Sequence, residues 1–145
     1  MRLTVLSDYS LRVLMYLAAR PDRLSTIQEI ASAYAISENH LMKVVHGLGK
    51  TGLVETMRGR GGGMRLARPA DKIKVGAVLR LVEEDQTLAE CFSEDDGCKI
   101  TDVCRLKRVL ARALQAYNDE LDRWTLADLV ARPKVLLDAL ADPRG

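Results

Sequence analysis

Apolar residues recur in the first half of the chain with the spacing of amphipathic helices. The pattern predicts a first helix that is opened by Ser7 or Asp8 and ends before Pro21. Its apolar positions are Leu11, Leu14, Met15 and Ala18. Such a stripe packs one side of a helix into a core and leaves the other side polar.

Two shorter helices are predicted next, joined by a tight turn at residues 35–36. Ser25 and Gln28 form a capping box at the start of the first, and Ser37 caps the second. Gly52 stands where a left-handed C-terminal cap is expected. Their apolar faces are Ile27, Ile30, Ala31 and Tyr34, and then Leu41, Val44, Val45 and Leu48. This arrangement is typical of a helix-turn-helix, whose second helix lies in the DNA major groove.

A short hairpin with a glycine-rich tip follows the helices. Residues 53–57 and 64–67 are predicted as its strands, with RGRGGG between them. Helices followed by such a hairpin form a winged helix. Arg58 and Arg60 at its tip are expected to lie along phosphates or in a minor groove. The third helix would contact base edges or phosphates through Ser37, Asn39, His40 and Lys43.

The second half of the chain is predicted to contain a helix over residues 74–84, an acidic loop and a long helix from Val103. Apolar residues follow the long helix at intervals of three and four: Val103, Leu106, Leu110, Ala113, Leu114, Tyr117, Leu121 and Trp124. A small N-terminal domain cannot cover so long a stripe, which predicts a homodimer; the alternative is a helix that folds back on its own domain. TLADLV is predicted as a short helix and VLLDALADPRG as a poorly ordered tail.

The predicted fold class is mainly α: a winged helix-turn-helix with a C-terminal long dimerisation helix. We expect a DNA-binding domain over residues 1–73, and a linker helix, cysteine loop and dimerisation helix over residues 74–145. Residues 1–68 carry ten Lys and Arg against five Asp and Glu, which favours an anionic partner such as nucleic acid. With no signal-peptide pattern and no apolar run of membrane-spanning length, the chain is expected to be cytoplasmic, without membrane association.

All three cysteines lie in one acidic segment, CFSEDDGCKITDVC, at Cys91, Cys98 and Cys104. Clustered thiols in a cytoplasmic protein more often bind metal or carry out redox chemistry than form disulfides. The long spacings lack the tight pair that is usual in structural zinc sites. An iron–sulfur cluster suits these spacings and keeps thiolates ionised in acidic surroundings. Zinc and a metal-free segment remain as alternatives.

Three cysteines leave a metal site one ligand short. Asp8 is a candidate because it is an acidic residue beside an apolar helix, with capping of that helix as an equal alternative. His40 and His46 are poor candidates, since their offset of six residues does not suit one ion and their helix is expected to meet DNA.

Catalytic patterns are absent from the sequence. We find no nucleophile–base pair, and RGRGGG lacks the Lys-Ser/Thr that completes a phosphate-binding loop. We therefore expect no enzyme. An electron carrier of the ferredoxin type would retain a cluster but would need neither a helix-turn-helix nor a wing.

Taken together, the motifs resemble a known family. LSDYSLRVLMYLA, IASAYAISENHLMKVVHGLGKTGLV, RGRGGGMRLA and a three-cysteine loop before a long helix are similar to the iron–sulfur winged-helix regulators that include IscR. The likeness runs from Met1 through Trp124 and is greatest to nitric-oxide-sensing repressors. It implies a dimer that binds palindromic promoter DNA and holds a cluster, 4Fe-4S favoured over 2Fe-2S, through its three cysteines.

The resemblance also implies that Asp8 supplies an oxygen ligand to the cluster of the other chain. IscR would have a histidine three residues after the last cysteine, where this sequence has Lys107, and the difference favours the nitric-oxide-sensing members. Two further interpretations stay open: an IscR-like regulator that senses redox state or cluster supply, and a zinc-stabilised DNA-binding protein.

Overall fold

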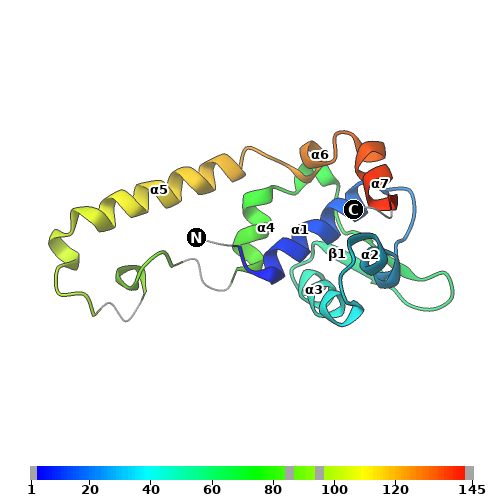
Figure 1. Ribbon diagram of the computed structural model, residues 1–145, viewed down its shortest axis with the longest axis horizontal. Coiled ribbons are helices and arrows are strands. Elements are labelled where there is room, and N and C mark those ends of the chain that lie inside the picture. The colour runs from blue at the N-terminus through cyan, green and yellow to red at the C-terminus, as the bar shows by residue number, and fades with distance from the viewer. Residues whose placement is uncertain (1–2, 84–86, 94–96, 143–145) are drawn as a thin grey trace.

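The structure, a computed structural model, describes residues 3–83, 87–93 and 97–142. Figure 1 shows a compact body from which one long helix, α5, extends as an arm. The body begins with α1 (Val5–Ala18), α2 (Ile27–Tyr34), α3 (Glu38–Lys50), β1 (Val54–Met57) and β2 (Gly63–Leu66). The prediction of a mainly α winged helix-turn-helix is therefore confirmed. Within the described ranges, every helix is too short or too polar to cross a membrane.

The first helix begins earlier than the sequence predicts. Thr4 is the N-cap of α1, and its side chain accepts a hydrogen bond from the Ser7 backbone N–H at 3.2 Å. The prediction that Ser7 or Asp8 opens this helix is wrong. Ser7 is fully buried in the first turn. Asp8 lies in the same turn, where a negative charge is favoured by the helix dipole.

The capping box of α2 also differs from the prediction by one residue. Thr26 accepts from the Glu29 backbone N–H at 3.2 Å, and the Glu29 carboxylate accepts from the Thr26 N–H at 2.7 Å. Ser25, which was predicted to cap this helix with Gln28, is instead buried. Its backbone N–H and C=O pair with Met64 of β2, so the residue extends the small sheet.

The turn between α2 and α3 and the cap of α3 are as predicted. Ala35 takes the left-handed conformation with φ 53°, and the Ser37 side chain accepts from the His40 backbone N–H at 3.2 Å. After α3, Gly52 has φ 72°, the value expected of a left-handed C-terminal cap. These three residues fix where the recognition helix α3 starts and stops.

The hairpin that follows is antiparallel, with Val54 opposite Leu66 and Met57 opposite Gly63. Its tip reverses direction through Gly59, whose φ of 99° would strain any residue with a side chain. The predicted wing is therefore present, with its strand ends within one residue of the predicted ones.

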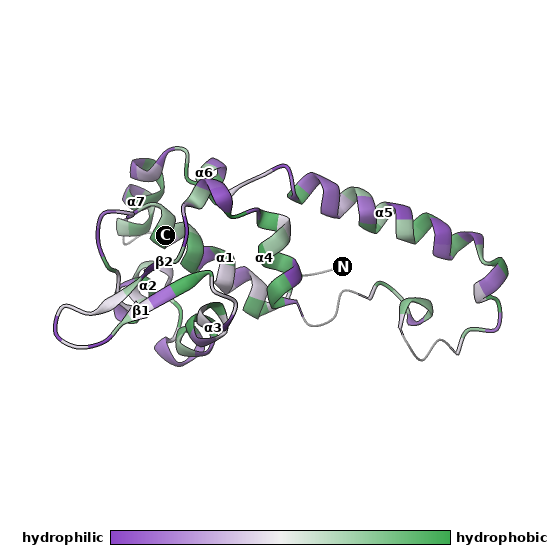
Figure 2. Ribbon diagram, turned by 180° about the vertical axis from the view of Figure 1, so that it is seen from behind, coloured by the Kyte–Doolittle hydropathy of each residue, from purple (hydrophilic) through white to green (hydrophobic). Residues whose placement is uncertain are grey.

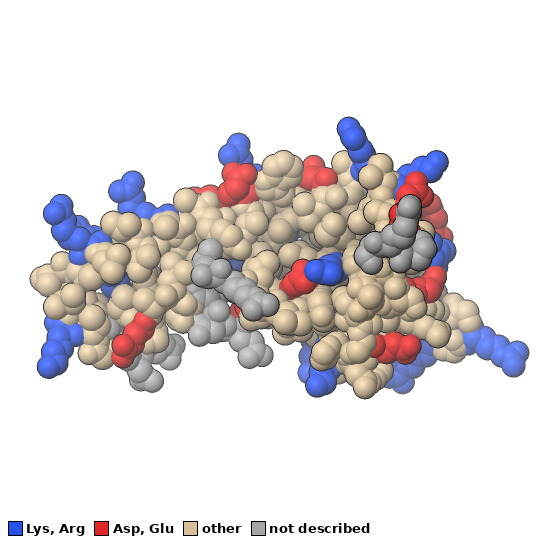
Figure 3. Space-filling model, viewed as in Figure 1, with Lys and Arg blue, Asp and Glu red and all other residues tan. Residues whose placement is uncertain are grey.

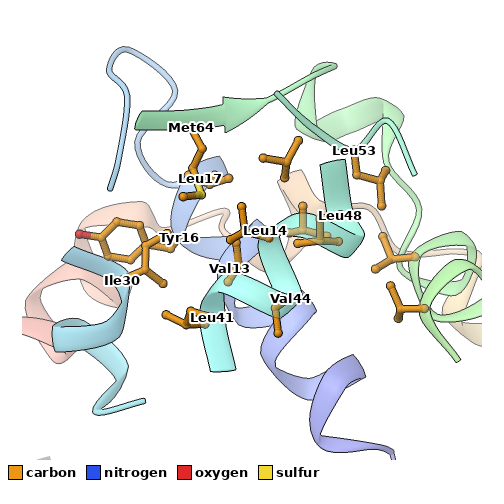
Figure 4. Close-up of a cluster of buried hydrophobic side chains, with 14 of the residues drawn as sticks. Val13, Leu14, Tyr16, Leu17, Ile30, Leu41, Val44, Leu48, Leu53 and Met64 are labelled. Carbon is orange, nitrogen blue, oxygen red and sulfur yellow. The ribbon is translucent and has the colours of Figure 1, made fainter. Parts of the chain in front are cut away.

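The core of the body lies between α1, α2, α3 and the sheet (Figure 4). Leu14 of α1, Ile30 of α2, and Leu41 and Leu48 of α3 are fully buried there. α1 contributes Val13, Leu14, Tyr16 and Leu17 to this core and packs directly against α3.

The second half contains α4 (Val75–Val82), α5 (Arg105–Leu121), α6 (Leu126–Leu129) and α7 (Pro133–Ala141). Short 3-10 helices are η1 (Ala70–Lys72), η2 (Glu90–Phe92) and η3 (Thr101–Val103). The long helix starts at Arg105 rather than at Val103, which belongs to η3. The predicted end of the preceding helix, at Glu84, lies outside the described residues.

The end of the chain folds back onto the body. Leu126 of α6 is fully buried, and its N–H donates to the Ile73 carbonyl at 2.9 Å. α7 packs against α2, with Leu137 and Leu140 against the core. The prediction of a poorly ordered tail is therefore wrong up to Ala141, since its leucines have an apolar surface to cover. The division after residue 73 stays a prediction.

The arm α5 has no buried residue in the single chain. Its predicted stripe remains largely uncovered, with Val103, Leu106 and Trp124 exposed and Leu110, Leu114, Tyr117 and Leu121 half-buried. Figure 2 shows hydrophilic and hydrophobic positions alternating along this helix. An amphipathic helix with an open apolar face is typical of an element that packs against another chain.

Candidate DNA interface and metal-binding segment

The face of α3 that points away from the core is polar. Its exposed residues are Ser37, Glu38, Asn39, His40, Met42, Lys43, His46, Gly49 and Lys50. The buried side of the same helix carries Leu41, Val44, Val45 and Leu48. The structure therefore brings the four residues predicted on α3 to one surface, where amide, imidazole and ammonium groups are available to base edges and phosphates.

Ser37 has a more restricted role than the others. Its side-chain oxygen already accepts the His40 backbone N–H, so the hydroxyl has its proton left to donate. The His40 ring lies 6.3 Å from the Tyr9 ring of α1, centroid to centroid. Asn39 and Lys43 are exposed.

The wing carries the second group of predicted residues. Arg58 and Arg60 are exposed on either side of Gly59 at its tip. In Figure 3, Lys and Arg side chains project from the lower edge of the molecule around α3 and from the wing beside it. A positive edge that joins a recognition helix to a wing fits the phosphate backbone of a duplex.

The cysteines lie in three different local structures. Cys91 is in η2, Cys98 follows residues 94–96, which lie outside the described residues, and Cys104 caps the N-terminus of α5. All three are half-buried, and no disulfide joins them in the described chain. Figures 1 and 2 show this segment beside the far end of α5, away from α1.

Lys107 contacts residues at both ends of the cysteine segment. The Lys107 backbone N–H donates to Cys104 Sγ at 3.4 Å, and Lys107 Nζ lies 6.0 Å from the Phe92 ring centroid. Phe92 is the neighbour of Cys91. Residue 107 therefore links the first cysteine's helix η2 to the last cysteine's helix α5.

A preformed metal site is not seen in the described part of the chain, where no three His, Cys, Asp or Glu side chains lie together. The donor set nevertheless fits an iron–sulfur cluster, because three thiols share one short segment and Cys104 Sγ sits at a helix N-terminus that favours negative charge. The set also remains compatible with zinc, for which it would likewise be one ligand short.

Asp8 is not placed with the cysteines in the single chain. Its carboxylate forms an ion pair with Arg12, at 3.0 Å from Nη2. The Asp8 and Arg12 side chains are 44% and 42% exposed, which leaves the carboxylate within reach of another chain. The described part of the single chain therefore does not bring Asp8 and the cysteines into one site.

Sequence reasoning missed two neighbours of these residues. Arg12 contacts Asp8, and its guanidinium carbon also lies 5.9 Å from the Tyr9 ring and 5.8 Å from the Tyr34 ring. The i, i+4 spacing of Asp8 and Arg12 is a signal that was available in the sequence. The second neighbour, Glu83 at the N-terminus of α1, had none, because 79 residues separate it from Thr4.

Comparison with known proteins assigns a family. The sequence model of the Rrf2 family, described as an iron-dependent transcriptional regulator, matches residues 3–132. The HTH-type transcriptional regulator NsrR of Bacillus subtilis is 51% identical over 97% of both chains. The NsrR of Geobacillus kaustophilus is 46% identical over the full length of both. The resemblance inferred from the motifs is therefore confirmed.

Solved structures give the same fold. The IscR of T. potens superposes with a TM-score of 0.73 at 27% identity, over 90% of this chain and 87% of that one. CymR, the global cysteine regulator of B. subtilis, superposes with a TM-score of 0.74 at 26% identity, over 90% and 97%. Both are winged-helix regulators, and neither comparison points to an enzyme.

Proposed function

Since this chain belongs to the Rrf2 family of iron-dependent transcriptional regulators, we propose that it is a dimeric repressor whose promoter affinity is set by an iron–sulfur cluster and falls in nitric oxide. It is a transcriptional regulator and not an enzyme. One observation supports the proposal most directly. The same chain has a polar exposed face on α3 and a segment with three thiols at the N-terminal end of α5. Double-stranded promoter DNA in the cytoplasm is the proposed partner.

The DNA-binding part is proposed to comprise residues 1–73. Asn39, His40 and Lys43 would enter the major groove, with Ser37 at the start of the helix and Arg58 and Arg60 of the wing on the backbone or in the minor groove. Phosphate contacts position such a protein, while base contacts give it sequence preference.

The remaining residues, 74–145, would form the dimer and the sensor. The open apolar stripe of α5 supports pairing with a second copy, because it is too long to remain exposed on a stable monomer. A two-fold axis along paired α5 helices would place two recognition helices for half-sites about one DNA turn apart.

Cys91, Cys98 and Cys104 are the residues proposed to hold the cluster, with Asp8 of a second copy as an oxygen ligand. When bound, a 4Fe-4S cluster would supply iron that nitric oxide binds. Cys104 caps α5, so its engagement fixes the sensor segment against the arm. Asp8 lies on α1, which packs against α3, so its engagement by another chain fixes the recognition helix. Release of Cys104 and Asp8 from the cluster would loosen the spacing between the two recognition helices of the dimer.

The test begins with protein purified without oxygen and its absorbance spectrum. A DNA fragment selected from random sequence by the cluster-loaded protein then serves as the operator. We expect a brown protein that bleaches on nitric oxide titration and releases this fragment. Unchanged affinity after complete bleaching would contradict the proposal.

Two alternatives give different results in the same experiment. A cluster that is indifferent to nitric oxide, while DNA is released on oxidation, would support a redox- or cluster-supply regulator, the interpretation favoured by the structural likeness to IscR. A colourless protein that contains zinc would leave a zinc-stabilised DNA-binding protein.

A further inference from the structure

A carboxylate from α4 holds the N-terminus of α1. Glu83 Oε1 accepts the Thr4 backbone N–H at 3.0 Å, and the Thr4 hydroxyl donates to the same oxygen at 3.1 Å. Thr4 is the N-cap of α1. The first turn of a helix has unpaired N–H groups and a partial positive charge. Glu83 therefore supplies an acceptor and a negative charge to α1 from a distant part of the chain.

Glu83 precedes the cysteine segment by only a few residues in the sequence. It is the C-terminal cap of α4. Cys91, in η2, follows eight residues later in the sequence. The contact with Thr4 therefore lies at the end of α4 that leads toward the cysteine segment.

The carboxylate is held in its ionised form. Partial burial acts to raise the pKa of Glu83, but hydrogen bonds from Ser7 and from Thr4 together outweigh it and lower the pKa below its usual range. Ser7 is fully buried one residue before Asp8. The contact is therefore anchored on the turn of α1 that carries the proposed oxygen ligand.

The same helix α4 is fastened to the arm. Arg80 Nη2 donates to both carboxylate oxygens of Asp122, at 2.8 and 3.0 Å, and Asp122 is the C-terminal cap of α5. Gly76 makes this approach feasible, since a Cβ atom there would lie 2.2 Å from Asp122 Oδ1. α4 is thus tied at Arg80 to the base of the arm and at Glu83 to the start of α1.

We propose that Glu83 is a positioning residue that transmits the state of the cysteine segment to α1 and, through α1, to the recognition helix α3. α1 and α3 share the core, and the Tyr9 and His40 rings meet where the two helices approach each other. A shift of the first turn of α1 would therefore reorient the exposed face of α3. The inference rests on the proposed function and adds the route by which it operates.

The test compares full-length Glu83→Ala with wild type in two states, cluster-loaded and cluster-free. Absorbance reports cluster content, and titration of the selected DNA fragment gives an affinity in each state. We expect Glu83→Ala still to bind the cluster. The ratio of its DNA affinity with cluster to its DNA affinity without cluster should fall about tenfold, the order of a typical allosteric coupling. This fall should come from weaker DNA binding by the cluster-loaded protein. Glu83→Gln should restore part of the ratio, because its amide oxygen can still accept from Thr4.

Glu120→Ala is the matched control. Glu120 is a glutamate at the C-terminal end of α5 that accepts from Trp124 Nε1 and pairs with Arg123, away from α1. Its removal should leave the ratio unchanged. If Glu83→Ala does not load cluster, Thr4→Val takes its place. It removes the hydroxyl and keeps the backbone N–H, and it should lower the ratio in the same direction by a smaller factor.

The outcomes separate this inference from the function on which it rests. Equal DNA affinity of wild type with and without cluster would overturn the proposed function itself. A large wild-type ratio that survives in Glu83→Ala would overturn only the role of Glu83. Equal weakening of both states would indicate a purely structural contact and would also overturn it.

Discussion

Lys107 Nζ lies 6.0 Å from the centroid of the Phe92 ring, so a cation on the first turns of α5 faces the residue next to Cys91. This contact joins the two ends of the cysteine segment, whose donors must converge to hold one cofactor. Cation–π contacts at exposed sites contribute roughly 0.5–1 kcal/mol.

We expect Phe92→Leu to shed the cluster faster, by up to about fivefold, because each ~1.4 kcal/mol corresponds to a factor of ten. Lys107→Met should have a similar effect, since it removes the charge and keeps the stem. Loss of visible absorbance under a chelator measures the rate. Lys99→Met, an exposed lysine of the same segment, is the control and should retain the wild-type rate. Equal rates in all variants would show that the contact has no role in retention.

The sequence predicted the body of the fold because its signals are local. The tight turn at Ala35, the Ser37 cap and the glycines of the wing each depend on neighbours within a few residues, and each is found where expected. The errors at Ser25 and at the start of α1 are also local. At α2 two adjacent polar residues were able to cap, and pairing with β2 buried Ser25 and left Thr26 as the cap. At α1 the N-cap is Thr4, three residues before Ser7, and Ser7 is buried in the first turn of the helix.

The features that could not be predicted from the sequence depend on contacts between residues far apart in the chain. The tail was predicted as poorly ordered because nothing near Leu137 shows that α2 offers it an apolar surface. The hydrogen bond between Thr4 and Glu83 has no local signature either. Of the candidate site, residue types and exposure on α3 and the wing were predictable, while the meeting of Asp8 with the cysteines stays a prediction that needs a second chain.

A substitution in the wing should affect DNA binding without affecting the cluster. Arg58→Ala should weaken binding to the selected fragment and reduce the slope of log affinity against log salt by about 0.9 for each phosphate that is no longer neutralised. The cluster spectrum should not change, because Arg58 lies on the wing and the cysteines lie beside the arm. Arg132→Ala, an exposed arginine before α7, is the charge-matched control. Bleaching of the cluster in Arg58→Ala would contradict this division.

Replacement of a sensor thiol should have the complementary effect. Cys98→Ser should lose the cluster absorbance and, with it, the high-affinity form of DNA binding. Its residual affinity should equal that of cluster-free wild type and retain the wild-type salt slope, since the wing arginines are intact. Loss of all DNA binding, below the cluster-free level, would mean that Cys98 is needed for folding.

The dimer prediction can be tested on the two sides of α5. Leu106→Asp places a charge in the exposed apolar stripe and should shift the sedimenting species from a dimer to the 16.1 kDa monomer. Arg108→Asp changes the charge of the same helix two residues on, on the opposite side, and should remain dimeric. A monomeric wild type, or a Leu106→Asp dimer of undiminished stability, would argue against pairing through this stripe.

The C-terminal segment should stabilise the DNA-binding body. Leu126 is fully buried between α1 and η1, and Leu126→Ala should lower the free energy of unfolding by about 2–5 kcal/mol. Val135 is 62% exposed, and Val135→Ala should cost about 0.5 kcal/mol or less. Urea denaturation at one fixed protein concentration measures both. Equal midpoints would show that α6 is dispensable for the body.

A buried phenol predicts how stability changes at alkaline pH. The Tyr34 hydroxyl is buried without a hydrogen-bond partner among the described residues, and burial raises its pKa to about 12. The folded protein therefore keeps its proton more strongly than the unfolded chain, whose tyrosines titrate near pH 10. The contribution of this group to stability is complete below about pH 10 and is lost as pH rises toward 12.

Tyr34→Phe should remove this dependence. It deletes the unpaired hydroxyl and keeps the ring that packs edge-on against Tyr16. We expect stability at pH 7 to be unchanged or slightly higher, because the hydroxyl makes no hydrogen bond that the substitution could remove. Thermal unfolding midpoints at intervals between pH 8 and about pH 11 should fall less steeply than in wild type. Tyr117→Phe on the arm controls for the general effect of removing a phenol, and a parallel decline in all three proteins would show that Tyr34 is not the group responsible.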